Sequence, residues 1–77
     1  MPRGVFNWSF HDVEKFLRSK GFQLNHIEGS HYYFTVSLNG IIHQVCVPFH
    51  GSKTFKPRTL KGIIVQSGFS KEEWLAG

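Results

Sequence analysis

Residues 29–49 read GSHYYFTVSLNGIIHQVCVPF, and this stretch decides the fold. Two runs rich in aromatic and β-branched residues, 31–38 and 41–49, flank the dipeptide Asn39-Gly40. Asn-Gly between such runs is the strongest short-range hairpin signal, because a type I′ turn requires positive φ at both central positions. The stretch therefore predicts two antiparallel strands. Pro48 cannot donate to a ladder, which predicts an edge or a strand end near it.

Alternation along both runs sorts the side chains onto two faces of the predicted sheet, since neighbouring residues of a strand point in opposite directions. The apolar face carries Tyr32, Phe34, Val36, Leu38, Val45, Val47 and Phe49. The opposite face carries His31, Tyr33, Thr35, Ser37, Ile42, Gln44 and Cys46. His43 shares the parity of Val45 and Val47, so we expect it at the rim of the core. The pattern predicts a sheet that is covered on one side only.

Upstream of the hairpin, the sequence predicts a helix and then a further strand. A capping-box pair, Ser9 and Asp12, opens a helical pattern that runs over 10–20. Gly21 is placed to end this helix as its C′ residue. The apolar positions of the next segment alternate with polar ones and are Phe22, Leu24 and His26. This alternation predicts a strand with His26 on its apolar side.

Downstream of the hairpin, Pro57 fits the first turn of a second helix, which Gly68 ends. Ser70 and Glu73 are spaced as another capping box and predict a last short turn around Trp74. Three sequential antiparallel strands and two amphipathic helices bury their apolar surfaces most economically as an α+β two-layer sandwich with both helices on one sheet face. The 77 residues are expected to form a single domain.

Composition narrows the possible classes of function. Nine Lys and Arg against five Asp and Glu give a net charge of +4, which favours a nucleic acid or an acidic protein as partner, although a small basic domain can simply be soluble. Cys46 is the only cysteine, which excludes an internal disulfide and a cysteine zinc cluster and fits a reducing cytoplasm. No apolar run approaches the ~20 residues that span a bilayer, and the N-terminus lacks a secretory apolar core.

Gly29-Ser30-His31 places a histidine where a turn passes into the first strand of the hairpin. Imidazole is the side chain that exchanges a proton near neutral pH. On the uncovered face of a basic domain, His31 therefore suggests acid–base chemistry on an anionic polymer. The alternative is a partly buried polar strand residue with no chemical role.

The order helix–strand–strand–strand–helix resembles the double-stranded-RNA-binding fold. Four segments narrow the resemblance to the HicA (YcfA-like) toxins of bacterial toxin–antitoxin systems: the first helix with its exit, a GSHxxF signature, a VxVPxH strand end and a helix that starts KPxTL. These segments lie at 13–22, 29–34, 45–51 and 56–70. Arg58 stands where glycine is usual, Ser67 stands where alanine is common, and the segment 1–8 is longer and more apolar than the family pattern.

The resemblance implies an mRNA interferase, an endoribonuclease that cleaves mRNA independently of the ribosome and is inhibited by a cognate HicB antitoxin. It also implies that His31, the histidine of the signature, is the catalytic residue. RNA carries its own nucleophile, the 2′-hydroxyl, so the chemistry needs a base, an acid and positive charge rather than a metal. The predicted function is therefore metal-independent RNA cleavage centred on His31, without a cofactor.

The residues around this histidine supply candidates for the other roles. Those for accessory or RNA-binding roles are Gly29, Ser30, Tyr33, His50, Lys53, Lys56 and Arg58. The glycine permits close backbone approach to an anion, the cations suit phosphate, and Tyr33 suits stacking on an unpaired base. His31 can act as base or acid. The second proton-transfer group stays open among His50, a lysine and the RNA itself, with a loop-capping role for His50 as the alternative.

The remaining chemistry-bearing residues are expected to be inert. His11, His26 and His43 are interpreted as structural or merely exposed, and the absence of HxH or HExxH spacing disfavours a metal site. Cys46 is interpreted as an inert strand residue, since a nucleophilic role would need His31 beside it as a base. Two rival functions remain, a non-catalytic RNA-binding module and a protein-interaction domain whose basic face meets an acidic partner.

Overall fold

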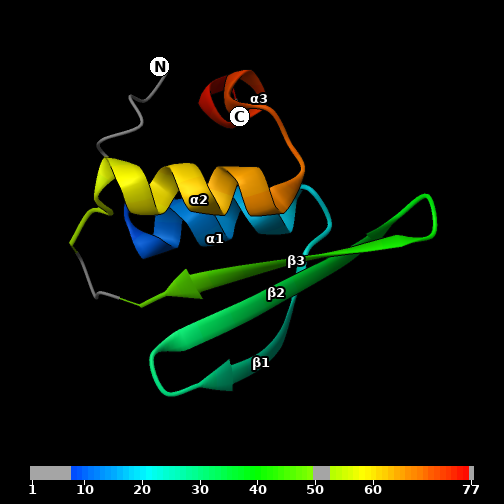
Figure 1. Cartoon of the computed structure of the whole chain (residues 1–77), viewed down its shortest axis with the longest axis horizontal. Coiled ribbons are helices and arrows are strands. Elements are labelled where there is room, and N and C mark those ends of the chain that lie inside the picture. The colour runs from blue at the N-terminus through cyan, green and yellow to red at the C-terminus, as the bar shows by residue number, and fades with distance from the viewer. Residues whose placement is uncertain (1–7, 50–52, 77) are drawn as a thin grey trace.

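The computed structural model describes residues 8–49 and 53–76. In chain order its elements are α1 (Phe10–Ser19), β1 (Gln23–Glu28), β2 (His31–Leu38), β3 (Ile41–Pro48), α2 (Pro57–Ser67) and α3 (Lys71–Ala76). The three strands form one antiparallel sheet in the order β1-β2-β3, so β2 is central. Both α1 and α2 lie on one side of this sheet, and no described element covers the other side (Figure 1). The predicted α+β two-layer sandwich is confirmed.

The first helix, α1, begins and ends within one residue of the prediction. Ser9 Oγ accepts a hydrogen bond from the Asp12 amide at 3.5 Å, and the Asp12 carboxylate accepts one from the Ser9 amide at 2.9 Å. This capping box satisfies amides that have no partner inside the helix. At the other end Gly21 has a φ of +94°, and the Phe22 amide donates to the Leu17 carbonyl at 2.9 Å. The buried residues of α1 are Phe10, Val13, Phe16 and Leu17.

The β2–β3 hairpin has the predicted turn and faces. Asn39 and Gly40 have φ values of +54° and +80°, the positive values that a type I′ turn requires. Pairing runs without interruption from the turn to His31 opposite Pro48. The fully buried residues of the hairpin are Phe34, Val45 and Val47. All three belong to the predicted apolar face, which the helices cover.

Strand β3 lies at an edge of the sheet, as the proline at its end predicts. An edge strand exposes amides that invite pairing with another chain. Here the amide of Cys46 donates to the side-chain oxygen of Gln66, on α2, at 3.1 Å. A helix side chain therefore occupies one of the outward amides of this edge.

Strand β1 contains an irregularity that alternation along the sequence did not predict. Leu24 lies opposite Phe34, but the next pair is His26 opposite Tyr33, so Asn25 is an extra residue in a β-bulge. Leu24 therefore shares the helix side of the sheet, whereas His26 lies on the other side with Tyr33. The prediction that His26 is on the apolar side is wrong, because strict alternation fails across an inserted residue.

The second helix, α2, begins and ends at the predicted residues. Pro57 occupies its first position and Gly68 ends it with a φ of +79°. A Cβ built at Gly68 would lie 2.9 Å from Cε1 of His43, so this glycine also lets the helix end approach the sheet closely. His43 is half-buried there, which confirms its predicted place at the rim of the core.

The short helix α3 closes the core through one aromatic residue. Trp74 stacks on Phe16 with ring centroids 3.9 Å apart and meets Trp8 edge-on at 5.5 Å. Its indole nitrogen donates to Ser67 Oγ at 3.0 Å, and that buried hydroxyl donates in turn to the Ile64 carbonyl at 2.6 Å. The serine that departs from the family pattern thus pairs the polar atom of a buried tryptophan.

The predicted short turn around Trp74 is confirmed as α3, where Ser70 Oγ accepts from the Glu73 amide at 3.2 Å. Among the described helices, none has the length and apolar character needed to cross a membrane.

Candidate nucleic-acid site on the open face of the sheet

The face of the sheet turned away from α1 and α2, here called the open face, carries the polar side chains of the three strands. Cross-strand pairing assigns to it Gln23, His26, Glu28, His31, Tyr33, Thr35, Ser37, Ile42, Gln44, Cys46 and Pro48. The predicted members of this face are all present, and β1 adds a histidine and a glutamate that the sequence analysis did not place there. The richest cluster lies at the end of the sheet where the β1–β2 turn meets the end of β3 (Figure 1).

His31 is the first residue of the central strand and is exposed. Its neighbours across the strands are Glu28 on β1 and Pro48 on β3. Gly29, with a φ of +59°, and Ser30 form the two-residue turn before it, and the Ser30 carbonyl accepts from the Phe49 amide at 2.7 Å. The turn and both flanking strands therefore fix the backbone of His31 while its ring stays open to solvent.

A second histidine lies beside Tyr33 on the open face. The rings of His26 and Tyr33 are stacked, with centroids 4.4 Å apart and planes 8° from parallel. His26 Nδ1 lies 2.7 Å from the side-chain oxygen of Asn25, and its Nε2 lies 3.6 Å from the Glu28 carboxylate. Each of these contacts orients the imidazole, so this exposed ring has a defined placement.

Tyr33 also contacts β3 through Cys46, which lies directly opposite it. A hydrogen bond with the Cys46 thiol, and the proximity of that thiol's charge when it ionises, raise the pKa of Tyr33 above its ordinary value. Partial burial and the nearby Glu28 carboxylate act in the same direction. One face of the Tyr33 ring is occupied by His26, and the stacking role that the sequence predicts stays a prediction for the other face.

The three predicted cations lie at the same end of the molecule but in the helix layer. Lys53, Lys56 and Arg58 are exposed and belong to the segment that leads into α2 and to its first turn. This segment is held against the approach to α1 by the Phe55 amide, which donates to the Trp8 carbonyl at 2.7 Å. In Figure 1 the start of α2 and the start of β2 lie at the same end of the chain fold.

The prediction for His50 falls outside the described residues. Within 8–49 and 53–76, no three His, Cys, Asp or Glu side chains lie close enough together to hold a metal ion. The residue that sequence reasoning missed is His26, and a usable signal was present. Counting outward from the Gly29-Ser30 turn pairs Glu28 with His31 and then His26 with Tyr33, without any reference to hydrophobic alternation.

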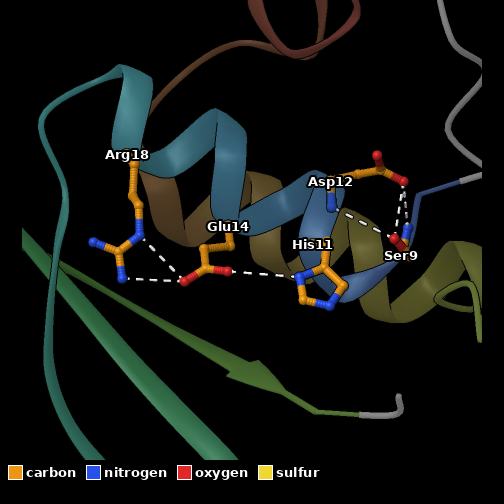
Figure 2. A network of polar contacts seen from close by, with 5 residues as sticks. All are labelled: Ser9, His11, Asp12, Glu14 and Arg18. Atoms are coloured by element: carbon orange, nitrogen blue, oxygen red, sulfur yellow. Dashed lines mark hydrogen bonds and ion pairs between the residues drawn. The ribbon is translucent and has the colours of Figure 1, made fainter. Parts of the chain in front are cut away.

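A separate polar network lies on α1, on the helix side of the sheet (Figure 2). Arg18 donates to the Glu14 carboxylate at 3.1 and 3.2 Å, and His11 Nδ1 lies 3.8 Å from the same carboxylate. The Arg18 guanidinium also lies over the ring of Phe34, 5.7 Å from its centroid. These contacts assign Arg18 to a structural role, and they place His11 on α1, on the opposite side of the sheet from the cluster on the open face.

Two comparisons with known proteins bear on what this arrangement is. No curated protein matches the sequence. A family model described as the HicA toxin of bacterial toxin–antitoxin systems matches residues 10–69, from the first residue of α1 to the second residue after the end of α2. The match includes the three strands, the bulge and the whole cluster around His31, and it extends over most of the chain. The chain therefore belongs to the HicA family of bacterial toxins.

Proposed function

We propose that this HicA toxin is a metal-independent endoribonuclease that cleaves mRNA, with His31 as a catalytic proton-transfer residue. The observation that carries the proposal is the placement of His31, exposed at the end of the central strand on the face that no described helix covers. A net charge of +4 supports a polyanionic substrate.

The proposed reaction is transesterification within the RNA. A base removes the proton of a 2′-hydroxyl, whose oxygen attacks the adjacent phosphorus, and the 5′-oxygen of the next nucleotide leaves. General acid–base help by one positioned histidine contributes about 10²–10⁴-fold to such a step. Lys53, Lys56 and Arg58 are proposed to hold the flanking phosphates, Gly29 and Ser30 to admit the backbone, and Tyr33 to stack on a base by the ring face that His26 does not occupy.

A toxin of a toxin–antitoxin system implies an antitoxin partner. We propose that this partner is HicB-like and covers the open face around His31. The support is steric and electrostatic: a substrate as large as RNA is excluded by any protein seated on that face, and a basic toxin favours an acidic partner.

The proposal is tested by incubating the purified protein with single-stranded RNA, with and without EDTA, beside His31→Ala and His11→Gln. The expected result is cleavage by the wild type and His11→Gln that EDTA does not change, leaving 2′,3′-cyclic phosphate and 5′-hydroxyl ends, and loss of cleavage in His31→Ala. Cleavage by His31→Ala at the wild-type rate would overturn the proposal.

The element order favours one second candidate, an RNA-binding module without cleavage activity. Its signature in the same experiment is intact RNA together with binding that weakens steeply with salt. In that case His31→Ala and the wild type would bind equally, because the phosphate contacts would come from the cations.

A further inference from the structure

We propose that His26 is the second proton-transfer residue of the site, acting as the general acid that protonates the leaving 5′-oxygen. This inference rests on the proposed ribonuclease function. It identifies the second proton-transfer group, which the reaction needs in addition to His31.

The first support is the place of His26 on the open face, which follows from the register set by the Gly29-Ser30 turn and holds although Leu24 faces the helices. In a regular strand His26 would share the side of Leu24, toward the helices. The inserted Asn25 lets Leu24 face the helices while His26 stays on the side of Tyr33 and His31. Bulges cost ladder pairing and are frequent beside active sites, where they redirect a side chain.

The second support is the spacing between the two histidines on the sheet. His26 lies opposite Tyr33, which is two residues from His31 on the same face, so the two histidines are diagonal neighbours across β1 and β2. The backbone positions of such neighbours are about 7–8 Å apart. Side chains that start from positions this close together can reach one phosphate from its two sides, as in-line displacement requires of the groups that serve the attacking and leaving oxygens.

The third support is the set of contacts that orient His26. An amide oxygen only accepts, so the 2.7 Å contact with Asn25 makes Nδ1 the donor and leaves Nε2 as the atom that exchanges a proton. The Glu28 carboxylate lies 3.6 Å from Nε2, within ion-pair distance of the protonated ring. Stacking on Tyr33 fixes the ring plane. This arrangement suits an imidazolium that gives up its Nε2 proton.

Other groups of the cluster are less suited to donate this proton. The pKa of Tyr33 is raised, chiefly by its hydrogen bond with Cys46, so the phenol resists releasing a proton near neutral pH. The predicted lysines belong to the segment that leads into α2, in the helix layer. No described contact joins either of them to His31 or His26.

The step balances with both histidines. The 2′-oxygen forms a bond to phosphorus and gives its proton to neutral His31, while the bond from phosphorus to the 5′-oxygen breaks and that oxygen takes the Nε2 proton of His26. The products are a 2′,3′-cyclic phosphate and a 5′-hydroxyl. His31 is then protonated and His26 neutral, and proton exchange with water restores both.

The test uses an RNA that contains the mapped cleavage site and carries sulfur in place of the leaving 5′-oxygen. A thiolate leaves without protonation, so this substrate does not need the acid. On ordinary RNA we expect His26→Gln to slow cleavage by about 10²–10⁴-fold. On the sulfur-containing RNA it is expected to cleave at nearly the wild-type rate, whereas His31→Ala stays slow on both substrates.

The controls distinguish a failure of the role proposed for His26 from a failure of the proposed ribonuclease function. His11→Gln changes a histidine on α1 and should match the wild type on both RNAs. If the wild type cleaves, His31→Ala does not, and His26→Gln cleaves ordinary RNA normally, only the role of His26 is overturned. Slow cleavage of both RNAs by His26→Gln also overturns it. A wild type that cleaves neither RNA overturns the ribonuclease function itself.

A stability measurement and a second variant test whether the loss of cleavage in His26→Gln comes from a change in structure. The His26 side chain is 45% exposed, so its replacement should leave the thermal unfolding midpoint unchanged. Asn25→Ala keeps the imidazole but removes the acceptor that orients it, and is expected to give a smaller loss on ordinary RNA, again restored by sulfur. Loss without such restoration in Asn25→Ala would contradict the proposed orientation.

Discussion

The two faces of the sheet are built from the same strands and obey different constraints. On the helix-covered face, Phe34 and Val45 are fully buried, and this packing fixes the register of the hairpin. On the open face, His31 and Tyr33 alternate with those core residues, and His31 is exposed while Tyr33 is half-buried. The difference shows that one face specifies the fold while the other is free to carry chemistry.

Among the substitutions that test this difference between the two faces, His31→Ala is expected to have the largest effect. We expect RNA cleavage to fall by about 10²–10⁴-fold, because one proton-transfer group is lost. The unfolding free energy should change by less than about 0.5 kcal/mol, since the side chain is exposed. Cleavage assays and denaturant unfolding on the same preparation measure both quantities. A large loss of stability would show that the two faces are not independent.

Phe34→Ala tests the opposite face of the same strand. Removing this fully buried ring is expected to cost about 3–5 kcal/mol of unfolding free energy, from lost burial and the cavity left behind. Gln44→Ala, an exposed change on the open face, is the matched control and should stay within about 0.5 kcal/mol. Urea unfolding measures both variants. If they lose similar amounts of unfolding free energy, the proposed difference between the two faces is wrong.

Ser67→Ala tests the polar contact that closes the core. Without the hydroxyl, the buried indole nitrogen of Trp74 loses its acceptor, which should cost about 1–3 kcal/mol. Ser37→Ala, on the exposed side of β2, serves as the control. A thermal midpoint that is equal in both variants would show that the buried hydrogen bond contributes nothing net.

The smallest expected effect concerns the titration of Tyr33. Its raised pKa means that the folded state favours the neutral phenol, so the associated stability is present below the unfolded pKa and is lost as pH rises through the folded pKa. In a Tyr32→Phe background, which leaves one tyrosine, phenolate absorbance should appear above the ordinary value of about 10. Adding Cys46→Ala should lower that midpoint, and an unchanged midpoint would contradict the role of the thiol.

Much of the fold was predictable because local signals agreed with one another. Asn39-Gly40, the alternation after His31 and the helix-ending Gly21 and Gly68 each act within a few residues, and the structure confirms all of them. The place of His31 on the open face follows from the same alternation.

What could not be predicted depends on geometry that alternation does not contain. The bulge adds one residue between Leu24 and His26, so the two lie on opposite sides of the sheet, and a parity rule has no means of detecting it. The bond between Ser67 and Trp74 joins α2 to α3 and depends on how the helices pack. The roles of the cations and of Tyr33 stay predictions, since they concern a bound RNA.

The contact between Gln66 and the outward amide of Cys46 has a consequence for assembly. Proteins that recognise one another by strand addition read the unpaired amides of a sheet edge. Along β3 an incoming strand would first have to displace a helix side chain, whereas a partner seated on the open face meets no such obstacle. The glutamine therefore obstructs strand addition at one position of the β3 edge.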